Sequence, residues 1–206
     1  ELGNFQYAPP AGYLALCTAN LPTPTIVDGF EHFNTVLYAG NSTTGHAITG
    51  VGFQPDWVWL KGRNYSGASY SLTDSVRGAT KRLSSDNTSA EITNAEYLQS
   101  FDADGFTVGT HAAHNASGYN YVAWNWKAGG TAVSNTDGSI TSQVSANVDA
   151  GFSVVSYSGV GASSGATVGH GLNKAPELIL PKNRGDVGSW HGYHSALGGT
   201  KGILLN

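Results

Sequence analysis

From Phe33 onward, the sequence is a close succession of short apolar or alternating runs separated by turn-forming residues. The clearest run, Asp56–Lys61, carries apolar side chains at both its odd and its even positions. A strand that is apolar on both faces belongs in the middle of a sandwich or barrel rather than at a solvent-exposed edge. Because many such short runs follow one another, the sequence predicts an antiparallel all-β fold.

The other strand-like runs end at glycines or at polar loops. Asp102–Gly105 predicts a hairpin turn, because Asp and Gly tolerate the left-handed backbone positions that such turns need. Two helix candidates, Asn87–Tyr97 and Ser145–Ala150, are too short to carry a fold. Further strands are predicted at Thr35–Ala39, His46–Val51, Ser69–Thr73, Lys81–Ser84, Tyr97–Phe101, Phe106–Thr110 and Tyr119–Lys127.

The composition excludes several other classes of protein. Met is absent and Gly accounts for 28 of 206 residues, which argues against a mainly helical chain. Asp+Glu is 14 against 10 for Lys+Arg and no basic cluster occurs, so no nucleic-acid partner is expected. No apolar run is long enough to cross a bilayer, so we expect no membrane insertion. The single Cys17 can form neither an intrachain disulfide nor a thiolate metal site.

Parts of the sequence recur at an offset of about 120 residues. Four matched blocks occur in the same order, and the offset drifts by only one or two residues between them. Such agreement predicts a tandem repeat whose apolar matches form the core of each copy. The matched blocks are Phe33–Gly40 with Phe152–Gly159, Gly52 with Gly171, Pro55–Arg63 with Pro176–Arg184, and Gly78–Lys81 with Gly198–Lys201.

The repeat predicts three parts in the chain. Residues 1–32 are an extended lead-in rich in Pro and Gly, residues 33–130 a first β-sandwich-like module, and residues 131–206 a second, partial module. The second module has no counterpart of Asn87–Gly129, so we expect the chain to continue. Ile203–Leu205 would then be a truncated apolar edge, which invites pairing with a partner.

Two cations that follow the central strand recur in both copies. Recurrence favours a shared structural role over a chemical one, such as pairing with Asp56 and Glu177 or with another acidic neighbour. These cations are Lys61 and Arg63 in the first module, and Lys182 and Arg184 in the second.

A family resemblance is carried by four long runs, Gly50–Lys61, Asp74–Lys81, Tyr121–Gly130 and Ser134–Ile140, and by the joining segment Phe5–Tyr13. These runs are similar to a repeat in tail-fibre and tail-associated proteins of marine and freshwater bacteriophages, which often follows a SPRY-like domain. The resemblance implies a virion component of the tail or fibre that forms a homo-oligomer, a trimer, and contacts other tail proteins. It implies no cofactor and no catalytic residue. The second module departs from the pattern, because Leu178 and Leu180 replace both tryptophans of the central strand.

No arrangement of residues indicates an enzyme or a metal centre, so we expect a non-enzymatic chain. His111 and His114, like His191 and His194, have a spacing that brings two rings together only in a helix, and neither segment is expected to be helical. No Gly-x-Ser-x-Gly sequence directly follows a predicted strand, as a nucleophile elbow requires, and the acidic turn lacks the rest of a calcium loop. Glycoside cleavage needs two carboxylates that face one cleft. The acidic residues that could be proposed are Asp102, Asp104, Glu91 and Glu96.

Carbohydrate binding is the sharpest functional hypothesis, because aromatic rings on loops beside a rigid sandwich offer a recognition surface. Tyr65 and Tyr70 flank the predicted loop after the central strand, and Trp190 and Tyr193 lie in the equivalent loop of the second copy. We predict that these four residues bind a host-surface glycan or receptor. Alternatively, they pack against loops or neighbouring subunits, and the chain is a structural spacer or decoration module. A third alternative is a polysaccharide depolymerase.

Overall fold

The computed structural model describes residues 10–11, 21, 23–161 and 165–206. These residues form strands β1 to β15, the short α-helix α1 (Ala112–Asn115) and the 3-10 helices η2 (Gly29–Glu31) and η3 (Ser195–Leu197). The predicted all-β fold is therefore confirmed. Most of the lead-in, including Cys17 and nearly all of the joining segment Phe5–Tyr13, lies outside the described residues.

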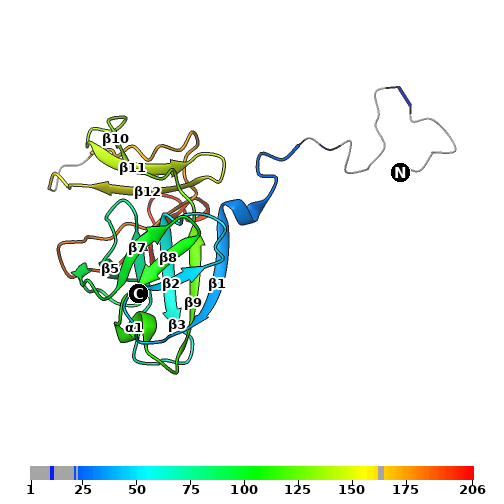
Figure 1. Ribbon diagram of the computed structural model, residues 1–206. Helices are drawn as coiled ribbons and strands as arrows, with labels where there is room; N and C mark the ends of the chain where they lie inside the picture. Colours follow the sequence, from blue (N-terminus) through cyan, green and yellow to red (C-terminus); the bar gives the residue numbers. More distant parts are fainter. Residues whose placement is uncertain (1–9, 12–20, 22, 162–164) are drawn as a thin grey trace.

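A six-stranded antiparallel sheet forms the centre of the first module (Figure 1). As its two apolar faces predict, β3 (Trp57–Gly62) lies in the middle of this sheet. Val58 and Leu60 are buried on one face of the strand, while Trp57 and Trp59 are half-buried on the other. The strand order is β1 (Phe33–Ala39), β9 (Asn120–Trp126), β3, β4 (Ser71–Asp74), β5 (Lys81–Ser84) and β6 (Ile92–Thr93).

A second, three-stranded sheet covers the Val58 face of the central sheet and closes the main core. It is formed by β2 (His46–Thr49), β8 (Gly105–Val108) and β7 (Leu98–Asp102), in that order. Phe106 and Val108 are fully buried in one cluster with Val58 and Leu60. Because burial of each such side chain stabilises a fold by roughly 1.5–3 kcal/mol, this cluster holds the first module together.

The predicted hairpin at Asp102–Gly105 is confirmed, since Asp102 pairs directly with Gly105 between β7 and β8. Gly105 has a φ of 145°, and a Cβ there would lie 2.0 Å from the carbonyl oxygen of Ile48. Glycine is required at this position because the neighbouring strand approaches so closely. The carboxylate of Asp104 in the same turn accepts hydrogen bonds from the amides of Gly52 and Gly50, which lower its pKa.

The second module packs on the opposite, tryptophan-bearing face of the central sheet. Phe152 stacks on Trp57 with ring centroids 5.5 Å apart, and Trp190 packs on Leu72 and Leu83. The central sheet is thus the middle of three layers, and β10–β12 lie across one end of the first module (Figure 1). The strands are β10 (Val133–Asn135), β11 (Ser142–Asn147) and β12 (Phe152–Tyr157) in one sheet, and β13 (Leu178–Ile179), β14 (His191–His194) and β15 (Ile203–Leu204) in another.

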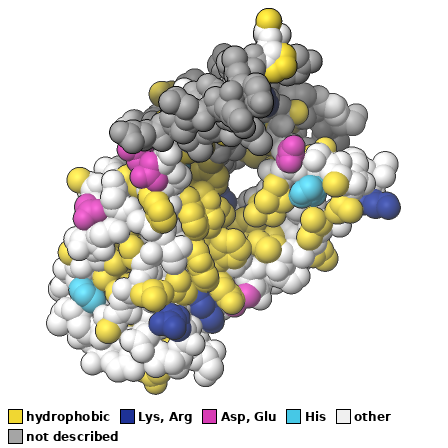
Figure 2. Space-filling view, turned by 90° about the vertical axis from the view of Figure 1, so that its right-hand side faces the viewer, with side chains coloured by type: hydrophobic (Ala, Val, Ile, Leu, Met, Phe, Trp, Pro, Cys, Tyr) yellow, Lys and Arg dark blue, Asp and Glu magenta, His cyan; other side chains and the backbone are white. Residues whose placement is uncertain are grey.

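The strand tryptophans line the junction between the modules rather than the main core. Trp57, Trp59, Trp124 and Trp126 lie on one face of the central sheet and are all half-buried. Their rings form a continuous series, with Trp57 and Trp126 4.7 Å apart between centroids. Figure 2 shows hydrophobic side chains gathered along a hollow on the side of the molecule that carries β1.

The pairing of β13–β15 follows that of β3–β5 position for position. Each paired residue lies 120 or 121 positions after its first-module counterpart, at the offsets that the sequence matches give. A backbone hydrogen bond also recurs, because the Ser75 amide donates to Asp56 and the Ser195 amide to Glu177, both at 2.8 Å. The equivalent pairs are Trp57–Asp74 with Leu178–His194 and Leu72–Leu83 with Gly192–Ile203.

Neither helix candidate forms a helix, although the last three residues of Ser145–Ala150 form a turn. Within Asn87–Tyr97, two residues form β6 by pairing with β5, and most of Ser145–Ala150 belongs to β11 or the turn after it. Pairing with the neighbouring strands therefore overrides the local preference of both segments. The one short α-helix, α1, begins instead after His111, whose ring accepts a hydrogen bond from the Ala113 amide.

Candidate functional site

Tyr65 and Tyr70 both lie in the loop between β3 and β4 and are half-buried. The ring of Tyr65 packs on Tyr119 with centroids 4.7 Å apart. The Lys61 ammonium lies 4.8 Å from the centroid of the Tyr70 ring, which meets Trp59 edge-on at 6.3 Å. Each tyrosine is therefore supported by protein on one side and keeps some surface for solvent.

The structure corrects the expectation that Trp190 and Tyr193 lie on an exposed loop. Trp190 is 6% exposed, and its indole N–H donates to the carbonyl oxygen of Ser84 at 2.7 Å. Tyr193 lies on β14 opposite Ile179 and is half-buried. The aromatic ring of Trp190 is drawn into the junction because the apolar surface of Leu72 is available there for burial.

The four cations that follow the central strand and its counterpart do not all have the same role. Arg184 pairs with Glu91 across the module junction, whereas Arg63 is exposed and pairs with no acidic side chain among the described residues. Lys61 donates to the carbonyl oxygen of Ala68, and Lys182 donates to backbone carbonyls in its own loop. The prediction of a common structural role is therefore wrong for Arg63 and Arg184, whereas Lys61 and Lys182 both donate to backbone carbonyls of the loop after their strand.

Among the described residues, no group of three or more His, Cys, Asp or Glu side chains is placed to hold a metal ion. Three of the four acidic residues considered for glycoside cleavage are engaged in local contacts. Asp102 accepts from the hydroxyls of Ser100 and Thr107, Asp104 holds the glycine loop before β3, and Glu96 accepts from Thr110. The fourth residue, Glu91, belongs to an ion-pair network.

His111 and His114 are brought together by α1, with ring centroids 6.2 Å apart. His114 is fully buried, and its Nε2 lies 2.9 Å from the hydroxyl of Ser71. This Ser–His contact resembles part of a catalytic triad, but no partner for the His114 Nδ1 lies among the described residues. Because Ser71 is also buried, the pair is a structural contact between β4 and α1.

His114 is expected to stay neutral to strongly acidic pH. Burial, and then the charges of Arg82 and His111, lower the pKa of His114 to about 3. The neutral His114 ring therefore contributes fully to stability above the unfolded-state pKa of about 6.5. This contribution is lost as the pH falls from 6.5 toward 3. In an NMR titration, the carbon-bound ring protons of His114 should not shift between about pH 8 and pH 4. A midpoint near the ordinary histidine pKa would contradict the burial of this ring.

An open cleft of about 560 Å³ lies where the end of β9 meets β11. This volume falls within the range of small-ligand sites, roughly 300–1,000 Å³. Both modules contribute to it, so the site exists only when they are packed together. The polar residues that line it are His32, Gln54, Asp56, Lys127 and Asn147.

The buried carboxylate of Asp56 shapes this cleft. One oxygen accepts hydrogen bonds from the amides of Ala128 at 2.8 Å and Gly130 at 3.1 Å, and the other accepts from the Ser75 hydroxyl at 2.8 Å. Asp56 is 2% exposed, so it is a positioning residue for the turn after β9 and not a group that faces a ligand. The sequence predicts Asp56 only as a partner of the cations after the central strand, and the Pro-Asp/Glu pair that recurs before that strand is the signal for its role at the turn.

Two polar side chains at the cleft remain available. Gln54 and Lys127 are exposed, and neither side chain has a hydrogen-bond partner among the described residues. In contrast, the Asn147 amide nitrogen is held between His32 Nδ1 at 2.9 Å and the Lys127 carbonyl oxygen at 3.2 Å. Phe33, next to His32, is 38% exposed and packs on Trp126. The cleft therefore combines free polar groups with a nearby aromatic ring.

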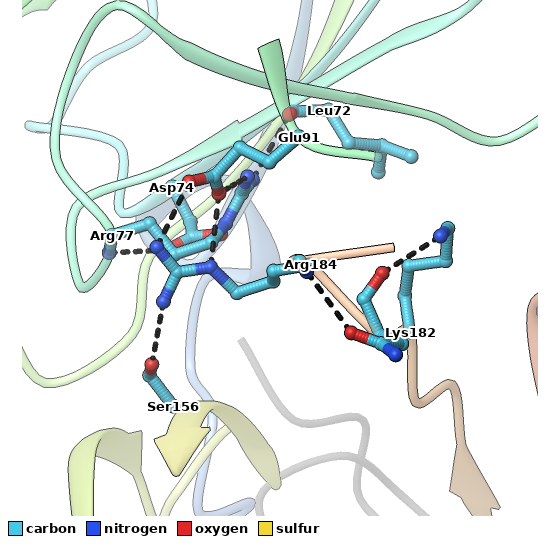
Figure 3. A network of polar contacts seen from close by, with 9 residues as sticks. Leu72, Asp74, Arg77, Glu91, Ser156, Lys182 and Arg184 are labelled. Atoms are coloured by element: carbon cyan, nitrogen blue, oxygen red, sulfur yellow. Dashed lines mark hydrogen bonds and ion pairs between the residues drawn. The ribbon is translucent and has the colours of Figure 1, made fainter. Parts of the chain in front are cut away.

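A buried ion-pair network ties the modules together beside the central sheet (Figure 3). Glu91 accepts from Arg77 Nη1 at 2.8 Å and from Arg184 through both Nη2 at 2.9 Å and Nε at 3.0 Å. Arg77 also pairs with Asp74, and Arg184 donates to Ser156 on β12. Burial raises the pKa of the Glu91 carboxyl, but the hydrogen bonds and charges of both arginines outweigh burial, so the pKa lies below its ordinary value.

The described residues form an all-β structure in which residues 131–206 pack against the six-stranded sheet, and residues on both sides of Gly130 line the cleft. Residues 28–206 match the family described as Domain of unknown function (DUF7483), and the chain belongs to this family. No curated protein and no solved structure matches the chain. No helix in the described part of the chain is long and apolar enough to cross a bilayer.

Proposed function

We propose that the chain is a non-enzymatic module of a phage tail fibre or tail-associated protein, and that it contributes to attachment by binding a host-surface glycan. The proposal rests on the resemblance to such repeats and on the all-β architecture. The observation that carries the binding step is the cleft between the modules. Gln54 and Lys127 are its free polar groups, and Phe33, which is 38% exposed, follows the cleft residue His32 in the chain. Hydroxyl-rich ligands are held by this pairing of hydrogen-bonding groups with an aromatic ring.

In this proposal the module acts as one of many weak binding units. A single open cleft makes few contacts with a ligand. A trimeric fibre carries several clefts and a particle carries several fibres, so avidity would multiply these weak contacts. The partners are thus other copies of the chain, neighbouring tail proteins and the host surface, and the chain is located on the virion. The half-buried Tyr65 and Tyr70 form a second aromatic surface that the same assay can test.

The test is glycan-array and host-cell binding by the intact protein, with the double variant Gln54→Ala/Lys127→Ala. Loss of both side chains should weaken binding by about 5- to 150-fold, because each lost hydrogen bond contributes roughly 0.5–1.5 kcal/mol. The matched control is Gln143→Ala/Lys174→Ala, which removes the same two residue types from exposed positions that do not line the cleft. Equal binding by the two double variants would overturn the cleft assignment, and loss on Tyr65→Ala alone would move the site to the tyrosine surface.

A structural spacer is the second candidate function. It is favoured by the burial of Trp190 and by the Glu91–Arg184 ion pair, which both use side chains to fix one module against the other. A spacer needs rigidity and no ligand. If the folded oligomer binds neither any arrayed glycan nor host cells, the spacer function is supported and recognition belongs elsewhere in the fibre.

A further inference from the structure

The acidic side chain that lines the cleft is already used by the protein itself. Both oxygens of the Asp56 carboxylate are occupied, one by the amides of Ala128 and Gly130 and the other by the Ser75 hydroxyl. These three donors offset the negative charge of the carboxylate, which is 2% exposed. Asp56 is therefore not available to accept hydrogen bonds from a ligand.

Asn147 fixes the position of the proton on the His32 ring. Its Oδ1 accepts from the Ala150 amide at 3.0 Å, which sets the orientation of the side-chain amide. Its Nδ2 therefore donates to the Lys127 carbonyl oxygen and to Nδ1 of His32. A ring nitrogen that accepts carries no proton, so in the neutral imidazole the proton lies on Nε2. His32 lines the cleft, and its Nε2–H has no hydrogen-bond partner among the described residues.

The cleft consequently offers a ligand more donors than acceptors. The free donors are the Lys127 ammonium, the Gln54 amide and the His32 ring N–H. Among the side chains that line the cleft, the one free acceptor is Oε1 of Gln54, because the acceptors of Asp56 and Asn147 are occupied. The charged group that remains available is the ammonium. A ligand that carries acceptors and a negative charge complements this set.

Two further acidic residues adjoin the cleft in sequence but do not line it. Glu31 precedes His32 and Asp149 follows Val148, and both acidic residues are exposed. Water and salt screen the charges of such exposed groups. They therefore reduce the long-range attraction of an anion but do not occupy the donors that would contact it.

We propose that the ligand of the cleft is a glycan that contains an acidic sugar, and that the Lys127 ammonium binds the carboxylate of this sugar. This inference rests on the proposed function and narrows its ligand to glycans with uronic or sialic acids. Gln54 and the Nε2–H of His32 bind neighbouring hydroxyl groups. Hydrogen bonds to an ionised group are roughly twice as strong as neutral ones, so the carboxylate dominates the choice of ligand.

The test compares acidic oligosaccharides with their methyl esters, which keep the sugar and remove its charge. The probes are sialyllactose and short oligomers of galacturonate and guluronate, and their binding to the intact protein is measured by calorimetry. We expect at least one acid form to bind about tenfold more tightly than its ester, as is usual for a hydrogen bond to a charged group. This preference should shrink when the salt concentration is raised to about 1 M, where screening acts over about 3 Å.

Variants of Lys127 assign the preference to one side chain. Lys127→Gln keeps a donor and removes the charge, so it should bind the acid and the ester equally. Lys127→Arg keeps the charge and should retain the preference. The matched control is Lys174→Gln, which removes an exposed lysine that does not line the cleft and should bind as the parent does.

The possible failures are distinguishable. Equal binding of acid and ester by the parent protein, together with binding of neutral glycans, would overturn this inference and leave the proposed function standing. A preference for the acid form that Lys127→Gln retains would overturn the role of Lys127. Tighter binding of sulfated neutral oligosaccharides than of any carboxylate would overturn the assignment to acidic sugars. If no glycan binds, neutral or acidic, the proposed function fails together with this inference.

Discussion

Replacing Trp190 with alanine should destabilise the protein by about 3–5 kcal/mol, as is usual for removal of a buried aromatic side chain. The ring is 6% exposed and fills the space between the modules against Leu72 and Leu83. The substitution leaves a cavity there and also leaves the carbonyl oxygen of Ser84 without the indole N–H. The free energy of unfolding, measured by urea denaturation and circular dichroism, reports the loss.

Two further variants separate packing from hydrogen bonding at this position. Trp190→Phe keeps most of the ring and removes the N–H donor, so it should cost about 1–3 kcal/mol, the cost of an unpaired buried acceptor. Phe30→Ala removes a ring that is 70% exposed and should change stability by less than about 0.5 kcal/mol. If Trp190→Ala costs no more than Phe30→Ala, the ring is not buried at a module junction in solution.

The strands of the first module could be predicted from sequence because each has its own periodic signal. Lys81–Ser84 forms β5 with the predicted bounds, and the ends of the other predicted strands shift by no more than two residues. The middle position of β3 followed from its two apolar faces. Asn87–Tyr97 and Ser145–Ala150 have one feature in common, since part of each segment pairs with an adjacent strand although neither segment has an alternating apolar pattern.

The cleft could not be predicted in the same way. Its walls come from residues such as Gln54, Lys127 and Asn147, which are distant in sequence and meet only after the modules pack. The four aromatic residues that the sequence predicts to bind a glycan were identified by their position in or near predicted loops. Trp190 shows why this criterion fails: a large ring in a loop is as useful for burial at an interface as for binding, and only tertiary packing decides between them.

The second large effect is expected at Glu91, where Glu91→Gln should destabilise the protein by about 3 kcal/mol. Breaking one partner of a buried ion pair costs about 3–5 kcal/mol, and the lower value applies because the Arg184 side chain is 38% exposed. The change leaves Arg77, whose side chain is 6% exposed, with Asp74 as its single carboxylate among the described residues, and it leaves Arg184 with none. Glu177→Gln, which changes an exposed glutamate without an ion pair in the described chain, should change stability by less than about 0.5 kcal/mol.

The pH dependence of this effect identifies the carboxylate. Because the pKa of Glu91 is lowered by the two arginines, its contribution is present above the ordinary pKa of 4.5 and is lost as the pH falls through the folded value. The difference in unfolding free energy between the parent and Glu91→Gln should therefore be constant from about pH 7 to pH 5 and shrink below pH 4.5. A double-mutant cycle with Arg184→Gln should give a coupling energy of about 0.5–3 kcal/mol. No coupling would show that the ion pair does not join the modules, and the cleft between them would then lack its fixed geometry.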